Sequence, residues 1–308
     1  ALYSLVKYRN SSKAEKLAEA SINAIFQYWN PTTEWDYDRL EREHKLSFQK
    51  PRSFVNGLAR TIGPLVKYYR VTNYGSALEL ALLLKQKTVN EAFTNDGSFD
   101  EKVFGYHIHS TTSVMSSLAQ LADLMKDSLL MNRVKTFYDN GLWKMRDQLG
   151  WSIESTNPAN INSDEGEMNN TGDILETALI LGRWGHTVYY HDAERILRCH
   201  LLPSQLRDVS FIKEPPNPQN VDGLKNVADR LRGAFGFPAP YGHKPLENER
   251  IRFNLDVVGG TVGSLCEAYR EISRSDQVGH WVNMLFDHES PSVKIESPYT
   301  HSSLRVTT

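Results

Sequence analysis

The sequence predicts a mainly α-helical fold, an α/α toroid of helical hairpins over residues 1–275, followed over residues 276–308 by the beginning of a C-terminal β-domain. Three observations predict it. Apolar residues recur at helical spacing in pairs of segments that short polar connections separate, which is typical of antiparallel helical hairpins. Long irregular loops lie between the pairs, and such loops usually carry function. After Gly279 the apolar period changes from 3.6 to 2, the period of a strand.

The helices are predicted in chain order from their apolar spacing and their ends. Residues 2–29 form the first helix, which Pro31 closes because proline cannot continue a helix. The polar, charge-mixed residues 32–50 are expected to form a loop. Three hairpins then pair residues 54–70 with 76–93, residues 110–125 with 129–149, and residues 171–184 with 190–202. Residues 259–272 supply the first helix of a further hairpin, and strands are expected at residues 280–286, 293–296 and 304–306.

The composition narrows the class of function. The 308 residues are 40% hydrophobic and 23% charged, which suits a large buried core and excludes disorder and collagen. The 35 Lys and Arg residues nearly balance the 37 Asp and Glu residues, so no basic field exists to hold nucleic acid or an anionic membrane. The longest apolar stretch, residues 77–84, is too short to span a bilayer. We therefore expect a soluble protein with a neutral or weakly charged substrate.

The cysteines and the chain ends say little about location. Cys199 and Cys266 are too few for a disulfide scaffold or for a zinc site made of thiolates. Cysteine usage therefore does not indicate in which cellular compartment the protein works. No charged-then-apolar leader precedes Ala1, and both ends fall within a regular pattern. We expect the chain to be a piece of a longer protein.

Residues 160–173 hold four carboxylates and four asparagines and lead into a predicted helix. Sugar chemistry needs such groups, because carboxylates exchange protons with the glycosidic oxygen and amides bind hydroxyls. Glu165, Glu167 and Asp173 are therefore candidate site residues. The alternative is a solvated acidic loop in which Asp173 interacts favourably with the helix dipole.

Glu176 and two histidines are further candidates. Glu176 lies in a run otherwise apolar enough to be buried, so it either binds substrate or pairs with an arginine of a neighbouring helix. His107 and His109 stand directly before a predicted helix, and in an extended segment both rings would point to one side. They are suited to bind sugar hydroxyls, move a proton or ligate a metal, although two histidines without a third ligand favour ordinary polar contacts.

Aromatic residues in loops are candidates for stacking on sugar rings. Trp151 and Tyr241 are the better ones, because Gly and Pro keep them out of helices, whereas Trp143 and Trp184 are expected in the core. The sequence contains no P-loop, no dinucleotide glycine fingerprint and no Gly-x-Ser-x-Gly elbow.

Three stretches resemble, in their order and spacing, the glycoside hydrolase family 127 proteins of the β-L-arabinofuranosidase type, within the six-hairpin glycosidase superfamily. They are residues 106–109 before a helix, residues 165–168 followed by 175–178 and 192–195, and residues 259–261 followed by 281–285. The resemblance covers roughly residues 50–308. It implies an (α/α)6 catalytic barrel followed by β-sandwich material, and exo-acting hydrolysis of glycosidic bonds.

The resemblance also assigns roles, with one departure. A Gly-Glu pair supplies the acid/base of that family, and this role falls on Glu167. A Glu-Thr-Cys sequence supplies two zinc ligands, of which Glu176 keeps the first while Ala178 replaces the cysteine. Two adjacent cysteines, one of them the nucleophile, fall on residues 258–260, which contain none. A zinc-held thiolate nucleophile cannot operate here.

We therefore expect a hydrolase without metal or cofactor that removes a terminal sugar from a plant or microbial glycan. Glu167 is the expected acid, with Asp173 or Asp256 as base; Asp256 lies near the missing nucleophile, and its alternative role is a helix cap. The expected partner is carbohydrate, not nucleic acid or membrane, and the sugar, linkage and oligomeric state stay open.

Two other functions are compatible with the same residues. In a polysaccharide lyase, His107 or His109 and a tyrosine would abstract a proton beside a uronate, and helical toroids host that chemistry too. In a catalytically degenerate glycan-binding protein, the carboxylates would lie too far apart, or too close to basic partners, to act as acid and base.

Overall fold

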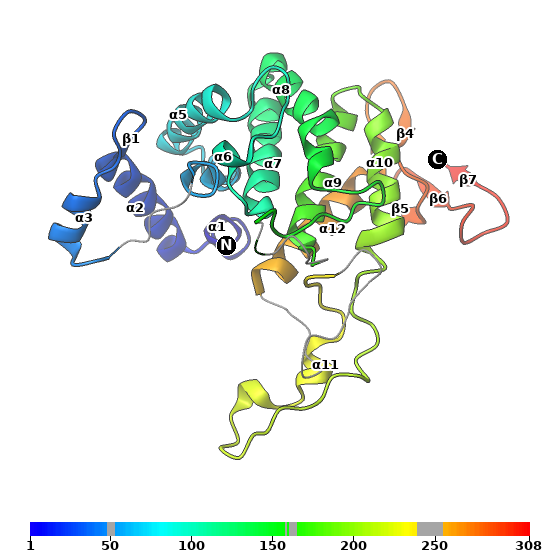
Figure 1. The fold of residues 1–308 in the computed structure, drawn as a ribbon. Helices are drawn as coiled ribbons and strands as arrows, with labels where there is room; N and C mark the ends of the chain where they lie inside the picture. The colour runs from blue at the N-terminus through cyan, green and yellow to red at the C-terminus, as the bar shows by residue number, and fades with distance from the viewer. Residues whose placement is uncertain (48–52, 158, 160–164, 239–254) are drawn as a thin grey trace. The chain divides into compact units, whose positions relative to one another are not determined.

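The computed structural model describes residues 1–47, 53–157, 159, 165–238 and 255–308 (Figure 1). The chain divides into two compact units, residues 1–144 and residues 145–308, and each is described by itself. The predicted fold class is confirmed: the chain is mainly α-helical, and short strands gather at its carboxyl end. No helix in the described ranges is long and apolar enough to cross a membrane.

The first unit contains the helices and strands from α1 to η2. In chain order they are α1 (Leu2–Arg9), α2 (Ser12–Tyr28), β1 (Trp29–Asn30), β2 (Glu34–Trp35), α3 (Tyr37–His44), η1 (Leu58–Thr61), α4 (Ile62–Thr72), α5 (Gly75–Glu91), α6 (Glu101–Phe104), α7 (Ile108–Met125), α8 (Ser128–Asp139) and η2 (Gly141–Lys144). The predicted hairpins are present: α4 packs against α5, and α7 against α8.

The amino-terminal segment differs from the prediction in two places. The expected single helix is broken, because Asn10 adopts a left-handed conformation (φ 48°) and the Ser11 hydroxyl caps a new helix by accepting from the Ala14 N–H at 3.3 Å. The expected loop over residues 32–50 contains β2 and α3, and β2 pairs with β1, which directly follows α2. Asp36 begins α3 by accepting a hydrogen bond from the Arg39 N–H at 3.0 Å, so the prediction missed a local helix cap.

The core of the first unit forms around α7, which α4 and α8 both contact. Phe93, Phe104 and Phe137 meet beside it, with ring centroids 4.7 to 5.2 Å apart. The expected burial of Trp143 is wrong, since its side chain is 42% exposed. The reason is that α8 ends at Asp139 and the following 3-10 turn places Leu142 in the interior instead.

The second unit contains the remaining helices and the other strands. In chain order they are α9 (Met168–Arg183), α10 (Val188–Ile196), the π-helical turn η4 (Leu197–Leu201), η5 (Asp222–Leu224), α11 (Val227–Leu231), α12 (Leu255–Glu271), β3 (Ser273–Ser275), β4 (His280–Val282), β5 (His288–Glu289), β6 (Lys294–Glu296) and β7 (Arg305–Thr307). The predicted hairpin of α9 and α10 is confirmed, and α12 packs on α9 as well.

The strands form two small antiparallel sheets. β3 pairs with β4, Ser273 lying opposite Val282, and β5, β6 and β7 follow one another in a second sheet with Ile295 opposite both His288 and Val306. The predicted strand at 280–286 is shorter than expected, and β3 and β5 were not predicted. Strands of two or three residues are too short to establish a period-2 pattern.

A long excursion leaves the helices of the second unit between residues 206 and 234 (Figure 1). Its two ends are joined by backbone hydrogen bonds between Leu206 and Ala234 at 2.9 Å and between Gly233 and Leu206 at 2.6 Å. The Glu214 carboxylate accepts from the N–H groups of Val227 and Ala228 at the start of α11. Residues 214–218 are irregular, as predicted.

Candidate active site

Glu167 is a buried carboxylate at the amino end of α9. It occupies the residue before the helix in an extended conformation, and its side chain is 5% exposed and does not cap α9. The amino end of a helix favours a negative charge. Burial of a carboxylate requires compensating contacts, and for Glu167 these do not include a bond to the end of its own helix.

The backbone on both sides of Glu167 is fixed by hydrogen bonds. The Gly166 N–H donates to the Pro238 carbonyl at 2.9 Å, the Glu167 N–H to Ser152 at 3.3 Å and the Met168 N–H to Gly236 at 3.1 Å. These bonds join three segments that are distant in sequence, so the direction in which the Glu167 side chain leaves the backbone is set by tertiary contacts.

Two side chains accompany Glu167. The Asn169 amide donates to its Oε1 at 3.2 Å, and Asn169 itself is buried. Trp151 is half-buried, and its indole N–H donates to the Pro238 carbonyl at 3.0 Å. The Asp147 carboxylate accepts from the backbone N–H of Trp151 at 3.0 Å and so orders the turn that presents the ring. An aromatic ring and an amide next to a carboxylate are groups that bind sugars.

Gly260 of α12 lies against Asn169. A Cβ on Gly260 would overlap the Asn169 Oδ1, so only glycine lets α12 approach α9 this closely. The Oδ1 atoms of Asn169 and Asn170 are buried and have no hydrogen-bond partner among the described residues. Asn169 is therefore held between α12 and Glu167 by packing on one side and a hydrogen bond on the other.

The donor set does not fit the zinc site that the resemblance implies. Ala178, at the position of a family cysteine, is fully buried in the core and offers no donor atom. At the position of the adjacent cysteines, Gly260 has no room even for a Cβ. Cys199 and Cys266 are both exposed. Neither position offers the sulfur ligand that the family's zinc requires.

Of the other carboxylates predicted for the site, two lie on α9, one lies on α12 and Glu165 precedes α9. Asp173 and Glu176 are half-buried on α9, where their spacing makes them neighbours on the helix surface. Helix geometry places Asp173 ~9 Å and Glu176 ~14 Å along the axis from Glu167. Glu165 is half-buried, and its carbonyl accepts from the Glu154 N–H at 3.0 Å. Asp256 lies in the first turn of α12.

Part of the predicted site lies outside the residues that the structure describes. The side chain of Asp256 and all of Tyr241 lie outside the described residues, as do residues 160–164 of the acidic segment.

The two histidines belong to the first unit, at the start of α7. His107 precedes the helix and His109 is in its first turn, so the segment is not extended as expected. Their rings still approach edge to face, with centroids 5.9 Å apart. The His107 Nδ1 lies 2.8 Å from the Ser110 hydroxyl. Both rings are half-buried.

Arg60 determines which nitrogen of His109 carries the proton. The Arg60 guanidinium lies 3.2 Å from the His109 Nδ1. A guanidinium can only donate, so Nδ1 accepts and the neutral ring has its proton on Nε2. The Nε2–H of His109 and the Arg60 guanidinium are both hydrogen-bond donors, and donors of this kind suit a hydroxyl or a carboxylate oxygen.

Sequence reasoning missed three residues that organise these two groups: Asn169 as a support of Glu167, Gly260 as the space for Asn169, and Arg60 as the partner of His109. Asn169 stood in the acidic segment, and its amide was the available signal. Arg60 and Gly260 are far in sequence from the residues they contact, and no local pattern marks such a pairing.

Neither a family model nor a curated protein matches the chain. Among solved structures it is similar to a glycosyl hydrolase of family 88 from Bacteroides vulgatus, with 13% identity, a TM-score of 0.43 and coverage of 76% of this chain and 68% of that one. It is similar to an inactive variant of an α-1,6-mannanase from Salegentibacter in complex with α-1,6-mannotriose, with 14% identity, a TM-score of 0.45 and coverage of 74% and 79%.

A third similar structure is a family 127 β-L-arabinofuranosidase from Geobacillus stearothermophilus T6, with 13% identity and a TM-score of 0.47. The match covers 97% of this chain and 60% of that one. All three TM-scores lie below 0.5, so these similarities carry no argument about the site or its chemistry.

Proposed function

We propose that this chain is a glycan-active enzyme, a glycoside hydrolase that removes a terminal sugar from a plant or microbial glycan by general acid/base catalysis with carboxylates. The observation that carries the proposal is the buried Glu167 carboxylate, which does not cap its helix and accepts a hydrogen bond from Asn169. A general acid for a glycosidic oxygen needs a carboxyl group in this setting, positioned and shielded from water.

Glu167 acts as the acid in this proposal, and Asp173 or Asp256 as the second carboxylate. In an inverting enzyme the second group activates water, and in a retaining enzyme it attacks the sugar. The proposal places no zinc at the family's positions, because Ala178 and Gly260 offer no ligand there.

The remaining residues would bind the sugar. Trp151 offers a half-buried indole held by Pro238, and ring faces of this kind stack on the C–H face of a sugar. His107 and His109, together with Glu165, Glu176 and Tyr241, supply donors and acceptors for hydroxyl groups.

The test is the Glu167→Gln variant, assayed on two kinds of substrate. On a natural oligosaccharide, whose leaving group needs a proton, kcat/KM should fall by about 10²–10⁴-fold. On a para-nitrophenyl glycoside of the same sugar the loss should be much smaller, because that leaving group departs without acid help. The basic limb of the pH–rate profile, which reports the acid, should disappear on the oligosaccharide.

The matched control is Glu267→Gln, the same change at an exposed carboxylate of α12 that pairs with Arg270. It should leave both rates unchanged. Equal losses on the two substrates for Glu167→Gln would contradict an acid role. Unchanged hydrolysis of the oligosaccharide would end the hydrolase proposal, and binding without turnover by the unaltered chain would leave a glycan-binding protein.

A polysaccharide lyase is the second candidate, and Arg60 beside His109 is the observation that favours it. A lyase needs a positive charge to bind the uronate carboxylate and a base to take the adjacent proton. Arg60 would supply the charge and His107 the base, because the Nδ1 of His109 accepts from Arg60. A lyase product contains a new double bond and absorbs ultraviolet light, whereas a hydrolase product does not. Absorbance during degradation of polygalacturonate or alginate therefore separates the two functions.

A further inference from the structure

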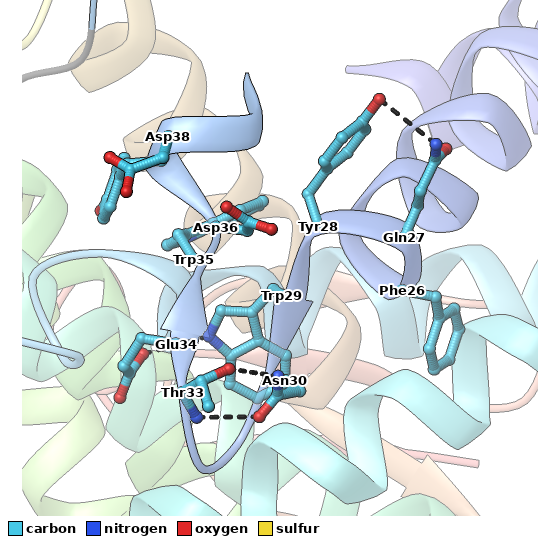
Figure 2. Close-up of a pocket in the computed structure, with 11 residues that line it drawn as sticks. Phe26, Gln27, Tyr28, Trp29, Asn30, Thr33, Glu34, Trp35, Asp36 and Asp38 are labelled. Carbon is cyan, nitrogen blue, oxygen red and sulfur yellow. Dashed lines mark hydrogen bonds between the residues drawn. The ribbon is translucent and has the colours of Figure 1, made fainter. Parts of the chain in front are cut away.

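A second place in the first unit has the composition of a ligand site. A pocket of about 470 Å³ is formed by residues 26–38, from the end of α2 through the β1–β2 hairpin to the start of α3 (Figure 2). The volume lies within the range of about 300–1,000 Å³ that is usual for small-molecule sites. None of its lining residues is among the candidate active-site residues, and the family resemblance does not extend to them.

The pocket is built on a rigid turn. Trp29 is 3% exposed, stacks on Phe54 with 14° between the ring planes, and donates its indole N–H to Glu34 at 3.1 Å. The Asn30 side-chain oxygen accepts from the N–H groups of Thr32 and Thr33 at 2.9 and 2.8 Å. Figure 2 shows Trp29 beside the bonded Asn30 and Thr33.

Glu34 adopts a left-handed conformation (φ 62°), which is unfavourable for a residue with a side chain. Its carboxylate is held by the Trp29 indole and by Lys87 at 2.7 Å. Such backbone strain persists only where surrounding contacts maintain it, and it concentrates at ligand sites. The strained turn places Trp35 directly across the hairpin from Trp29.

Two lining groups have no part in this scaffold. The Trp35 ring is half-buried and the Asp38 carboxylate is exposed, and neither the Trp35 indole N–H nor the Asp38 carboxylate has a hydrogen-bond partner in the described ranges. Asp36 differs, because it caps α3. An indole face, an indole N–H and a carboxylate are thus left for a ligand.

We propose that this pocket is a carbohydrate subsite that holds a neutral oligosaccharide on Trp35. The ring stacks on the C–H face of a sugar, while Asp38 and the Trp35 N–H bond its hydroxyls. Glu34, Asp36 and Asp38 disfavour an anionic ligand. Neutral polar groups with one free carboxylate favour a ligand that carries many hydroxyl groups. A site for an organic cation would instead be expected to place paired carboxylates around the aromatic ring.

The inference rests on the proposed function for the choice of probe glycans alone. The experiment measures binding with the full chain carrying Glu167→Gln, so that turnover does not interfere. The probes are cellohexaose, xylohexaose, mannohexaose and arabinohexaose, each titrated alone by calorimetry. At least one hexaose should bind, and Trp35→Ala should weaken that binding about fivefold to tenfold.

Two variants keep the test decisive. Trp143→Ala removes a different tryptophan of the same unit, one that is exposed, and should leave the affinity unchanged. Asp38→Asn keeps an acceptor and the shape of the side chain; it should change the affinity for a neutral sugar less than about threefold and should leave its independence of salt intact.

Three results would overturn the inference: no hexaose binds at millimolar concentration, Trp35→Ala binds as well as its parent, or tetramethylammonium binds instead with an affinity that Asp38→Asn and added salt both abolish. Loss of hydrolysis in Glu167→Gln tests the proposed function separately, because the binding measurement does not depend on turnover.

Discussion

Arg146 and Asp192 form the most deeply buried ion pair described in the second unit. The Arg146 side chain has no exposed surface, and its two terminal nitrogens donate to the Asp192 carboxylate at 3.0 and 2.9 Å. Arg195 donates to the same carboxylate. The paired geometry matches a guanidinium to a carboxylate, and the Arg146 Nε donates in addition to the Asp147 carbonyl at 3.0 Å. Asp192, part of a stretch that carried the family resemblance, therefore has a structural role.

Asp192→Asn should lower the free energy of unfolding by about 3 kcal/mol, because it removes the negative charge that both terminal nitrogens of the buried Arg146 guanidinium contact. Urea denaturation followed by circular dichroism measures the change. The control is Asp139→Asn, which removes the exposed partner of Lys135 and should cost less than about 1 kcal/mol. Losses of similar size in the two variants would show that burial of the Arg146 pair does not matter.

At the scale of helices, α9 and α12 approach closely through glycines. Gly172 lies opposite Ser264, whose hydroxyl would be 2.6 Å from a Cβ, and Gly260 lies opposite Asn169. The helix pair thus supports Asn169 and, through it, Glu167. Gly263 is also in α12, but a Cβ there would meet nothing within 4 Å.

Gly260→Ala should push Asn169 away from Glu167, destabilise the chain by about 1–3 kcal/mol and reduce kcat/KM, since overpacking displaces both helices. Gly263→Ala should instead stabilise it by about 0.5–1 kcal/mol without affecting turnover, because alanine is the better helix former. Thermal midpoints and initial rates measured side by side report both effects. A stable and fully active Gly260→Ala variant would contradict the support assigned to Asn169.

At the scale of the whole unit, the C-terminal strands are fastened to the helices. The Arg198 guanidinium lies 4.0 Å from the ring centroids of both Phe286 and Tyr299 and donates to the Leu285 carbonyl at 2.6 Å. The Leu285 N–H donates in turn to Glu194 at 3.0 Å. Strands and helices are therefore expected to unfold together.

Because strands and helices are expected to unfold together, the protonation of His288 in β5 should affect the free energy of unfolding of the whole unit. Burial lowers the pKa of His288 below 6.5, and its ring packs against Tyr269 with centroids 5.0 Å apart. Below pH 6.5 the unfolded chain takes up a proton that the folded chain resists, so stability is complete above that pH and declines as the pH falls toward the folded pKa.

His288→Phe should flatten that decline, which thermal unfolding at a series of pH values between about 5 and 7.5 would measure. His280→Gln, at an exposed histidine of β4, should retain the decline of the parent chain. An unchanged pH dependence in His288→Phe would mean that other groups are responsible for it.

The sequence by itself determined the three helical hairpins and the change from helices to strands near the carboxyl end. It did not determine the break at Asn10, the helix α3 or the short strands β3 and β5. Apolar spacing and turn residues are local properties, so the α4–α5, α7–α8 and α9–α10 pairs and the strands at the carboxyl end were predictable. Glu167 was predictable as a candidate as well, because it lies in the segment 160–173, which holds four carboxylates and four asparagines; its role as the acid came from the family resemblance.

Only the tertiary structure decided which side chains are buried and which residues contact one another. The exposure of Trp143, the pairing of Arg60 with His109, the contact of Gly260 with Asn169 and the pocket of residues 26–38 all depend on how segments meet in space. Contacts between segments distant in sequence depend on the whole packing arrangement rather than on local spacing. For that reason the sequence predicted the helices of this protein and one candidate acid, whereas the groups that support that acid became visible only in the folded chain.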